Sequence, residues 1–243
     1  EVAELLASVR AWDRAAGRTV HLPLSELRLA YRDSALKRSL TDPDVGAGRT
    51  WGPTGRWVVL SATFHVRQAS LSAPIAYRQL AGALGVDMGA RVDAREVREA
   101  VLALRRSKGM VLDADDHDTW SAGSFFTNPI LTRAAAAALP EDAPRFPVTD
   151  HTRVVAGVQD APVVDGLVKT SAAWLIDHAG FPKGFAAPGA SGRARLSTRH
   201  VLALTNRGGA TAADVAALRD TIVAGVRERF GITLVPEPVA VGW

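Results

Sequence analysis

Three helices with clear signals at both ends constrain the fold of this chain more than any other feature of its sequence. Residues 93–109, 171–180 and 211–231 each open on an Asp, Ser or Thr that can cap a helix N-terminus. Each range closes on a glycine, which can adopt the left-handed conformation that ends a helix. Strand-like segments are separated by unlike elements, without a regular alternation of strand and helix. This order predicts the α+β class.

The strands are predicted near the N-terminus, where apolar and polar residues alternate. Residues 5–24 are typical of two short strands around a turn, and residues 56–67 alternate as a half-buried strand does. The segment between them, residues 41–53, is rich in Gly and Pro and predicts a surface loop.

Composition excludes several classes of protein. Hydrophobic residues make up 47% and charged residues 22% of the chain, which is ordinary for a folded globular protein. The net charge of +4 suits an anionic partner, but arginines mixed with acids argue against nucleic acid. Apolar runs fall short of the ~20 residues that a membrane span needs. The absence of cysteine fits a reducing compartment, so we expect a cytoplasmic protein with no membrane and no nucleic-acid partner.

The sequence lacks the common local motifs for binding metals and nucleotides. The sequence has no His-x-x-x-His pair, no Gly-x-Gly-x-x-Gly segment and no P-loop, so no metal site is predicted. The acidic segment 113–118 lacks the Gly and the terminal Glu of a calcium loop. We expect it to be a solvated loop.

Four segments, in order along the chain, carry a family resemblance. They are Tyr31-Arg-Asp-Ser34, Gly123-Ser-Phe-Phe-Thr-Asn-Pro129, Ser171-Ala-Ala-Trp-Leu-Ile-Asp-His-Ala-Gly180 and Leu234-Val-Pro-Glu237. Together they resemble the motifs of the UDP-N-acetylenolpyruvoylglucosamine reductase (MurB) family. The resemblance implies the C-terminal part of an FAD-binding α+β domain followed by a MurB-type α+β substrate-binding domain.

The resemblance also implies a reaction and its catalytic residues. In this family NADPH reduces FAD, and hydride then passes to C3 of UDP-N-acetylglucosamine enolpyruvate, so charge develops beside the substrate carboxylate. Such charge needs cationic or hydrogen-bonding groups and a proton donor. Arg32, Ser124 and Glu237 match the family positions for these tasks, with the Ser124 hydroxyl as proton donor. We expect the three side chains to surround a single cavity.

Each of these residues also has an ordinary structural interpretation. Taken alone, Arg32 would form a surface salt bridge, Ser124 would turn the chain, and Glu237 would be a solvated residue between two prolines. Only the motif context favours the catalytic interpretation.

Further contacts follow from the same resemblance. His200 stands where one branch of the family often has glutamine, and Lys108 matches a lysine near the substrate diphosphate. The residues implied in substrate binding are Tyr31, Tyr77, Lys108, Asn128 and His200, and those implied in cofactor binding are Arg32 and Val59.

The domain organisation predicted from the resemblance has three parts. Residues 1–70 would be the C-terminal part of the FAD-binding domain, residues 71–110 a connecting loop and helix over the substrate site, and residues 111–243 the substrate-binding domain. The family's segments around the FAD pyrophosphate lie upstream of Glu1, so the chain is interpreted as N-terminally incomplete. The opening strand also lacks a partner in this interpretation. We expect a monomer.

Two other functions stay open from the sequence. The missing flavin segments and the positive charge are compatible with a non-catalytic module that binds a nucleotide sugar without flavin. A relative from the broader flavin oxidase group is less well supported, because that group lacks the combined Ser124 and Glu237 segments.

Overall fold

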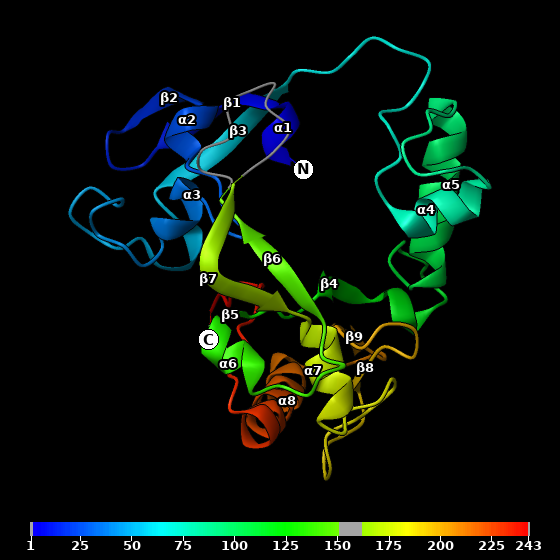
Figure 1. Ribbon diagram of the computed structural model, residues 1–243. Helices are drawn as coiled ribbons and strands as arrows, with labels where there is room; N and C mark the ends of the chain where they lie inside the picture. Colours follow the sequence, from blue (N-terminus) through cyan, green and yellow to red (C-terminus); the bar gives the residue numbers. More distant parts are fainter. Residues whose placement is uncertain (1, 151–161, 243) are drawn as a thin grey trace.

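The computed structural model describes residues 2–150 and 162–242, and its helices and strands form an α+β architecture as predicted. The strands form three antiparallel sheets of three strands each, in the orders β2-β1-β3, β4-β9-β8 and β5-β7-β6. Figure 1 shows the first sheet in an N-terminal lobe, a helical arm on the other side, and the remaining strands in a C-terminal lobe below both.

The N-terminal lobe contains the predicted hairpin. β1 (Leu6–Asp13) pairs with β2 (Arg18–Pro23) on one side and with β3 (Trp57–Phe64) on the other. The expectation that the opening strand lacks a partner is therefore wrong, because residues 57–64 return to it. Short helices complete the lobe: α1 (Val2–Leu5), α2 (Leu24–Leu27), α3 (Ala35–Arg38) and the 3-10 helix η1 (Gly52–Thr54), which overlaps the end of the predicted loop.

Two kinds of contact hold this lobe together. Leu6, Val9 and Leu27 form a small buried apolar cluster. At the end of β1, the nearly buried carboxylate of Asp13 accepts hydrogen bonds from Arg56 Nε at 2.9 Å and Arg56 Nη2 at 2.7 Å. This bidentate pair fixes the start of β3 against the end of β1.

β3 differs from its prediction in burial. Val58, Val59, Leu60 and Phe64 keep 47–48% of their surface exposed, although their alternation indicates a half-buried strand. Consecutive residues point to opposite faces, so both faces of β3 are open. Its outer edge pairs with no other strand within residues 2–150 and 162–242. The alternation of residues predicted the strand correctly, but the half-buried environment expected from that alternation was wrong.

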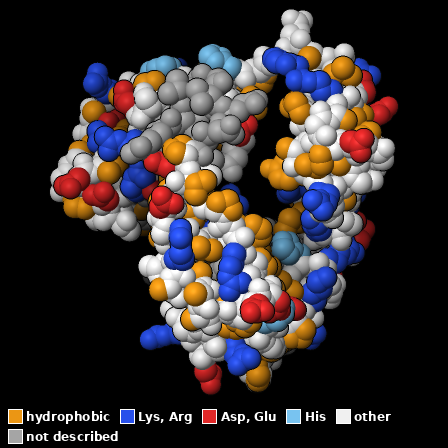
Figure 2. Space-filling model, in the orientation of Figure 1, with side chains coloured by type: hydrophobic (Ala, Val, Ile, Leu, Met, Phe, Trp, Pro, Cys, Tyr) orange, Lys and Arg blue, Asp and Glu red, His pale blue; other side chains and the backbone are white. Residues whose placement is uncertain are grey.

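The helical arm consists of α4 (Arg78–Leu84) and α5 (Ala94–Ser107). The predicted cap is confirmed: Asp93 accepts hydrogen bonds from the backbone N–H groups of Arg95 and Glu96. The two helices pack mainly on each other, through Ile75, Leu80, Ala81, Val97, Val101 and Leu104. Figure 2 shows an open passage between this arm and the N-terminal lobe.

The C-terminal lobe holds the main core between two sheets and two helices. Its sheet strands are β4 (Ser121–Ser124), β5 (Ile130–Thr132), β6 (Arg145–Thr149), β7 (Val163–Thr170), β8 (Ala194–Leu196) and β9 (Ala203–Asn206). Its helices are η2 (His117–Thr119), α6 (Arg133–Ala137), α7 (Ala172–His178) and α8 (Ala212–Phe230). Leu175, Ile176, Leu196, Leu218 and Ile222 are fully buried in this core.

Both predicted helices of this lobe end where their sequence signals indicate. Ser171 caps α7 by accepting from the N–H of Trp174. Thr211 and Asp214 form a reciprocal capping box at the start of α8, and Gly231 ends the helix with φ +69°.

In the described part of the chain, no helix has both the length and the apolar character required to cross a bilayer.

Candidate active site

Arg32 lies at the tip of a tight turn that precedes α3. The backbone N–H groups of Ala30 and Asp33 each donate to the other residue's carbonyl, at 3.0 and 3.2 Å, so the two residues between them must reverse the chain. Arg32 takes a φ of +54°, which a residue with a side chain adopts only at a cost of about 1–3 kcal/mol. The surrounding contacts therefore hold this arginine in an unfavourable conformation.

Glu237 is positioned by a short antiparallel pairing with the segment after β4. The N–H of Thr127 donates to the carbonyl of Val235, and the N–H of Glu237 donates to the carbonyl of Phe125 at 2.8 Å. Phe126, between them, is buried in the main core and anchors the pairing. Glu237 consequently lies beside the end of β4, where Ser124 is located.

Arg32 and Glu237 meet in an ion pair. Arg32 Nε lies 3.0 Å from Glu237 Oε2, with 52% and 34% of the two side chains exposed. An ion pair this accessible contributes about 0–1 kcal/mol to stability. The structure thus brings two of the three predicted catalytic side chains into contact.

Ser124 is adjacent to this pair through its backbone. It pairs with Ala203 of β9, and the N–H of the next residue, Phe125, donates to the carbonyl of Leu202 at 2.7 Å. Within residues 2–150 and 162–242, its hydroxyl makes no hydrogen bond. The hydroxyl is therefore free to donate a proton to a ligand.

Tyr31 and Asn128 also meet. The backbone N–H of Asn128 donates to the Tyr31 hydroxyl at 3.2 Å, and Lys169 Nζ lies 4.8 Å from the centre of the Tyr31 ring. The Asn128 side-chain oxygen accepts the N–H of Ala172 at the start of α7. Because this oxygen is already used, the side-chain NH₂ group of Asn128 is the part that can donate a hydrogen bond to a substrate.

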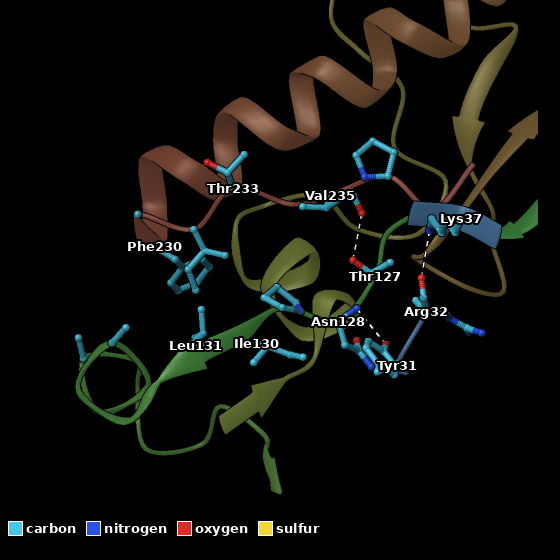
Figure 3. Close-up of a pocket in the computed structure, with 16 residues that line it drawn as sticks. Tyr31, Arg32, Lys37, Thr127, Asn128, Ile130, Leu131, Phe230, Thr233 and Val235 are labelled. Carbon is cyan, nitrogen blue, oxygen red and sulfur yellow. Dashed lines mark hydrogen bonds between the residues drawn. The ribbon is translucent and has the colours of Figure 1, made fainter. Parts of the chain in front are cut away.

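A cavity of about 600 Å³ borders this region (Figure 3). Tyr31, Arg32 and Asn128 line one end, and Leu131 and Phe230 line the apolar opposite end. Ser124 and Glu237 do not line it. The expectation of one cavity surrounded by all three catalytic side chains is therefore wrong for this cavity, although the Arg32–Glu237 contact joins its rim to the Ser124 strand.

A second group of predicted residues lies where the arm meets the C-terminal lobe. Lys108, at the C-terminal end of α5, donates from Nζ to Gln79 Oε1 of α4 at 2.8 Å. Burial lowers the pKa of His200, and the charges of Lys108 and Lys183 lower it further. These surroundings favour the neutral form of the His200 ring over its cation. Sequence reasoning missed Lys183, which follows Phe-Pro in an ordinary turn sequence.

Tyr77 and Val59 stand apart from the other predicted site residues. Tyr77 precedes α4 on the arm with 71% of its surface exposed, and Val59 lies on the open strand β3. In the part of the chain that is described, neither side chain hydrogen-bonds to another predicted site residue. Figure 1 shows the arm and β3 on opposite sides of the opening between the lobes.

The acidic loop is solvated only in part: Asp113 and Asp115 are exposed as expected, whereas Asp118 is not. Asp118 is only 5% exposed and forms an ion pair with Arg207, while Asp116 pairs with Arg199. Burial acts to raise the pKa of Asp118, but hydrogen bonds and the Arg207 charge outweigh it and the pKa lies below its ordinary value. No cluster of three metal-ligating side chains occurs in residues 2–150 and 162–242.

A family model decides the relationship. The C-terminal domain of UDP-N-acetylenolpyruvoylglucosamine reductase matches residues 115–241, which is more than half of the chain. The chain belongs to the UDP-N-acetylenolpyruvoylglucosamine reductase (MurB) family. The match includes Ser124, Asn128, His200 and Glu237 of the candidate site.

Curated MurB relatives match over essentially the whole chain. The chain is 49% identical over 243 residues to UDP-N-acetylenolpyruvoylglucosamine reductase of Streptomyces avermitilis, covering 100% of this chain and 60% of the relative. It is 51% identical over 242 residues to that of Nocardia farcinica, covering 100% and 57%. The chain therefore spans about three fifths of the length of the MurB relatives it matches. The MurB crystal structure from Thermus caldophilus is similar at 18% identity and a TM-score of 0.45, covering 98% of this chain and 53% of that one.

Proposed function

We propose that the protein containing this chain reduces UDP-N-acetylglucosamine enolpyruvate to UDP-N-acetylmuramate, using NADPH and FAD, in peptidoglycan precursor synthesis. Membership of the MurB family supports the reaction class. The observation that carries the proposal is the ion pair between Arg32 and Glu237, because the backbone of Glu237 pairs with Phe125, the residue that follows Ser124. The absence of cysteine supports a cytoplasmic setting.

The three side chains suit the charge changes of this reaction. Arg32 offers a planar fork of donors to the substrate carboxylate and keeps its positive charge at neutral pH. As charge develops beside that carboxylate, the Arg32 cation stabilises it. The Ser124 hydroxyl then supplies a proton to the adjacent carbon, and Glu237 holds the Arg32 fork in place through Nε.

The residues present fit one side of a flavin site. FAD, when bound, would carry hydride from NADPH to the substrate. The exposed apolar β3, with Val59, offers a surface for the cofactor and for the rest of its domain, and Arg32 of the same lobe offers a cation. We propose that residues 1–70 are the C-terminal part of the FAD-binding domain, and that an upstream segment packs on β3.

The remaining residues suit a nucleotide-sugar substrate. Lys108 provides a cation and His200 a hydrogen-bonding group for a diphosphate, and Tyr31 and Asn128 line the same cavity as Arg32. Tyr77 is carried on the exposed arm, from which it can cover a bound ligand. We propose residues 71–110 as the segment that covers the substrate and residues 111–243 as the substrate-binding domain.

The test uses a longer form of the protein that includes the upstream part of the FAD-binding domain. We expect the purified protein to be yellow from bound flavin, to consume NADPH only when UDP-N-acetylglucosamine enolpyruvate is present, and to form UDP-N-acetylmuramate. A colourless protein that binds UDP-N-acetylglucosamine without turnover would instead support the non-catalytic module.

A further inference from the structure

Asp118 connects segments that are far apart in the sequence. Its Oδ1 accepts the backbone N–H of Thr198 at 2.9 Å and Nη1 of Arg207 at 2.8 Å, and its Oδ2 accepts the Thr198 hydroxyl. The carboxylate is nearly fully buried, so these donors replace the water it would otherwise bind. The two Thr198 donors hold η2 against the turn between β8 and β9, and the Arg207 donor ties it to the residue that follows β9.

That turn carries His200. The buried Ser197 hydroxyl accepts the backbone N–H groups of Arg199 and His200, at 3.0 and 3.3 Å. Asp116 adds a contact from the same loop as Asp118, because its carboxylate lies 2.8 Å from Arg199 Nη2. The position of His200 therefore depends on the loop at 113–119.

The same loop also receives the end of α5. Gly109 follows Lys108, has φ +69°, and lies so close to Asp118 that a Cβ there would meet the Asp118 carbonyl oxygen at 2.9 Å. Arg199 Nη1 reaches the carbonyl of Arg106 in the last turn of α5 at 3.4 Å. The backbone beside Lys108 thus packs on the residue that fixes the His200 turn.

We infer that Asp118 is a positioning residue that holds Lys108 and His200 together as one diphosphate-binding unit. This inference rests on the proposed function for its ligand, a nucleoside diphosphate sugar. Asp118 itself does not touch the ligand, because its oxygens are occupied by Thr198 and Arg207. It acts by fixing where the arm and the C-terminal lobe present their two ligand-binding side chains.

The test compares three variants with the unsubstituted protein, all in the longer form that includes the upstream part of the FAD-binding domain. Asp118→Asn keeps the shape of the side chain but removes its charge, and Thr198→Val removes one donor to Asp118 while leaving the Arg207 pair. Asp115→Asn, on the exposed part of the same loop, is the matched control. Thermal unfolding identifies any variant that fails to fold, in which case Thr198→Val decides.

Two measurements are made on each variant. Calorimetry with UDP-N-acetylglucosamine gives the dissociation constant, which we expect to rise about tenfold for Asp118→Asn and less for Thr198→Val. NMR titration gives the pKa of His200. If the turn is released, His200 becomes hydrated and moves from Lys108, so its pKa rises towards the ordinary value. Loss of the nearby negative charge without movement lowers it instead.

The outcomes separate this inference from the proposed function. Weaker binding with a raised pKa of His200 in Asp118→Asn, and neither change in Asp115→Asn, supports the positioning role. Unchanged binding, or a pKa of His200 that falls or stays constant, overturns it. If the unsubstituted chain binds no UDP-N-acetylglucosamine, the proposed substrate is wrong, and the titration alone then decides whether Asp118 positions His200.

Discussion

Replacing Glu237 with glutamine tests whether the Arg32–Glu237 pair serves stability or reaction. The pair is a 3.0 Å contact between side chains that are 52% and 34% exposed, so water screens it strongly. Pairs of this kind contribute about 0–1 kcal/mol. The backbone bond from Glu237 to Phe125 survives the substitution. We therefore expect the free energy of unfolding to fall by less than about 1 kcal/mol.

Catalysis should respond far more strongly than stability. Glutamine keeps the volume but loses the charge that orients the Arg32 fork, and proton-transfer machinery of this kind typically contributes about 10²–10⁴-fold to rate. We expect NADPH consumption in the longer, flavin-containing form to fall about hundredfold or more. Urea unfolding of the same variant should move its midpoint by less than about 0.5 M, given typical m-values.

A matched control is available on α5. Glu99 forms an exposed ion pair with Arg98, and Glu99→Gln should change neither stability nor rate measurably. If Glu237→Gln lowers stability by several kcal/mol while turnover is retained, the pair is structural and the reasoning is refuted.

Three further predictions concern other parts of the molecule. Ser124→Ala should leave reduction of the cofactor by NADPH nearly unchanged and slow reoxidation of the cofactor by substrate by orders of magnitude, because only the second half-reaction needs the proton. If stopped-flow absorbance shows that both half-reactions slow equally, Ser124 does not have this role. Gly225→Ala should lower the free energy of unfolding by about 1–2 kcal/mol, because the new Cβ would lie 2.4 Å from the buried Phe181 ring. In Gly82→Ala the new Cβ meets no atom within 4 Å, so the free energy of unfolding should rise by about 0.5–1 kcal/mol. Equal effects of the two substitutions in denaturant titrations would contradict the clash at Gly225. Hydrogen bonds at the cap of α8 lower the pKa of Asp214 from 3.8 to about 2. The contribution of Asp214 to the free energy of unfolding is therefore complete above pH 4 and is lost as the pH falls towards 2. Urea titrations should show that Asp214→Asn loses less stability than the unsubstituted protein over this pH range, and equal losses would exclude the effect.

Local signals predicted the helices because their determinants lie within a few residues. The capping box and the glycine of α8 are both in contact with the helix they delimit, so the sequence window contains the whole interaction. Ser171 at α7 is the same case. Helix ends of this kind can be predicted without knowing the fold.

Burial could not be predicted in the same way. The alternation in β3 correctly indicates a strand, but exposure depends on what packs on it, and in residues 2–150 and 162–242 both faces remain open. Asp118 is the opposite case: its acidic neighbours suggest solvent, yet Thr198 and Arg207, far along the chain, enclose it. Burial is determined by distant segments, which no local pattern contains.

The motifs predicted which residues form the candidate site, but they could not predict its geometry. The segments at 31–34, 123–129 and 234–237 predict a catalytic group of Arg32, Ser124 and Glu237, and this assignment stays a prediction. The contact between Arg32 and Glu237 depends on the pairing of residues 125–127 with 235–237 and on the left-handed conformation of Arg32, neither of which is visible in the sequence. The cavity boundary, which omits Ser124 and Glu237, was equally unpredictable.

The open strand β3 affects how the whole protein can be synthesised and handled. During translation an N-terminal segment leaves the ribosome first, so a cover encoded upstream of β3 would already be available when the strand emerges. A copy made without that cover would expose an apolar edge capable of pairing with the same edge of another copy. Aggregation of truncated forms would then reflect an unprotected strand rather than an unstable core.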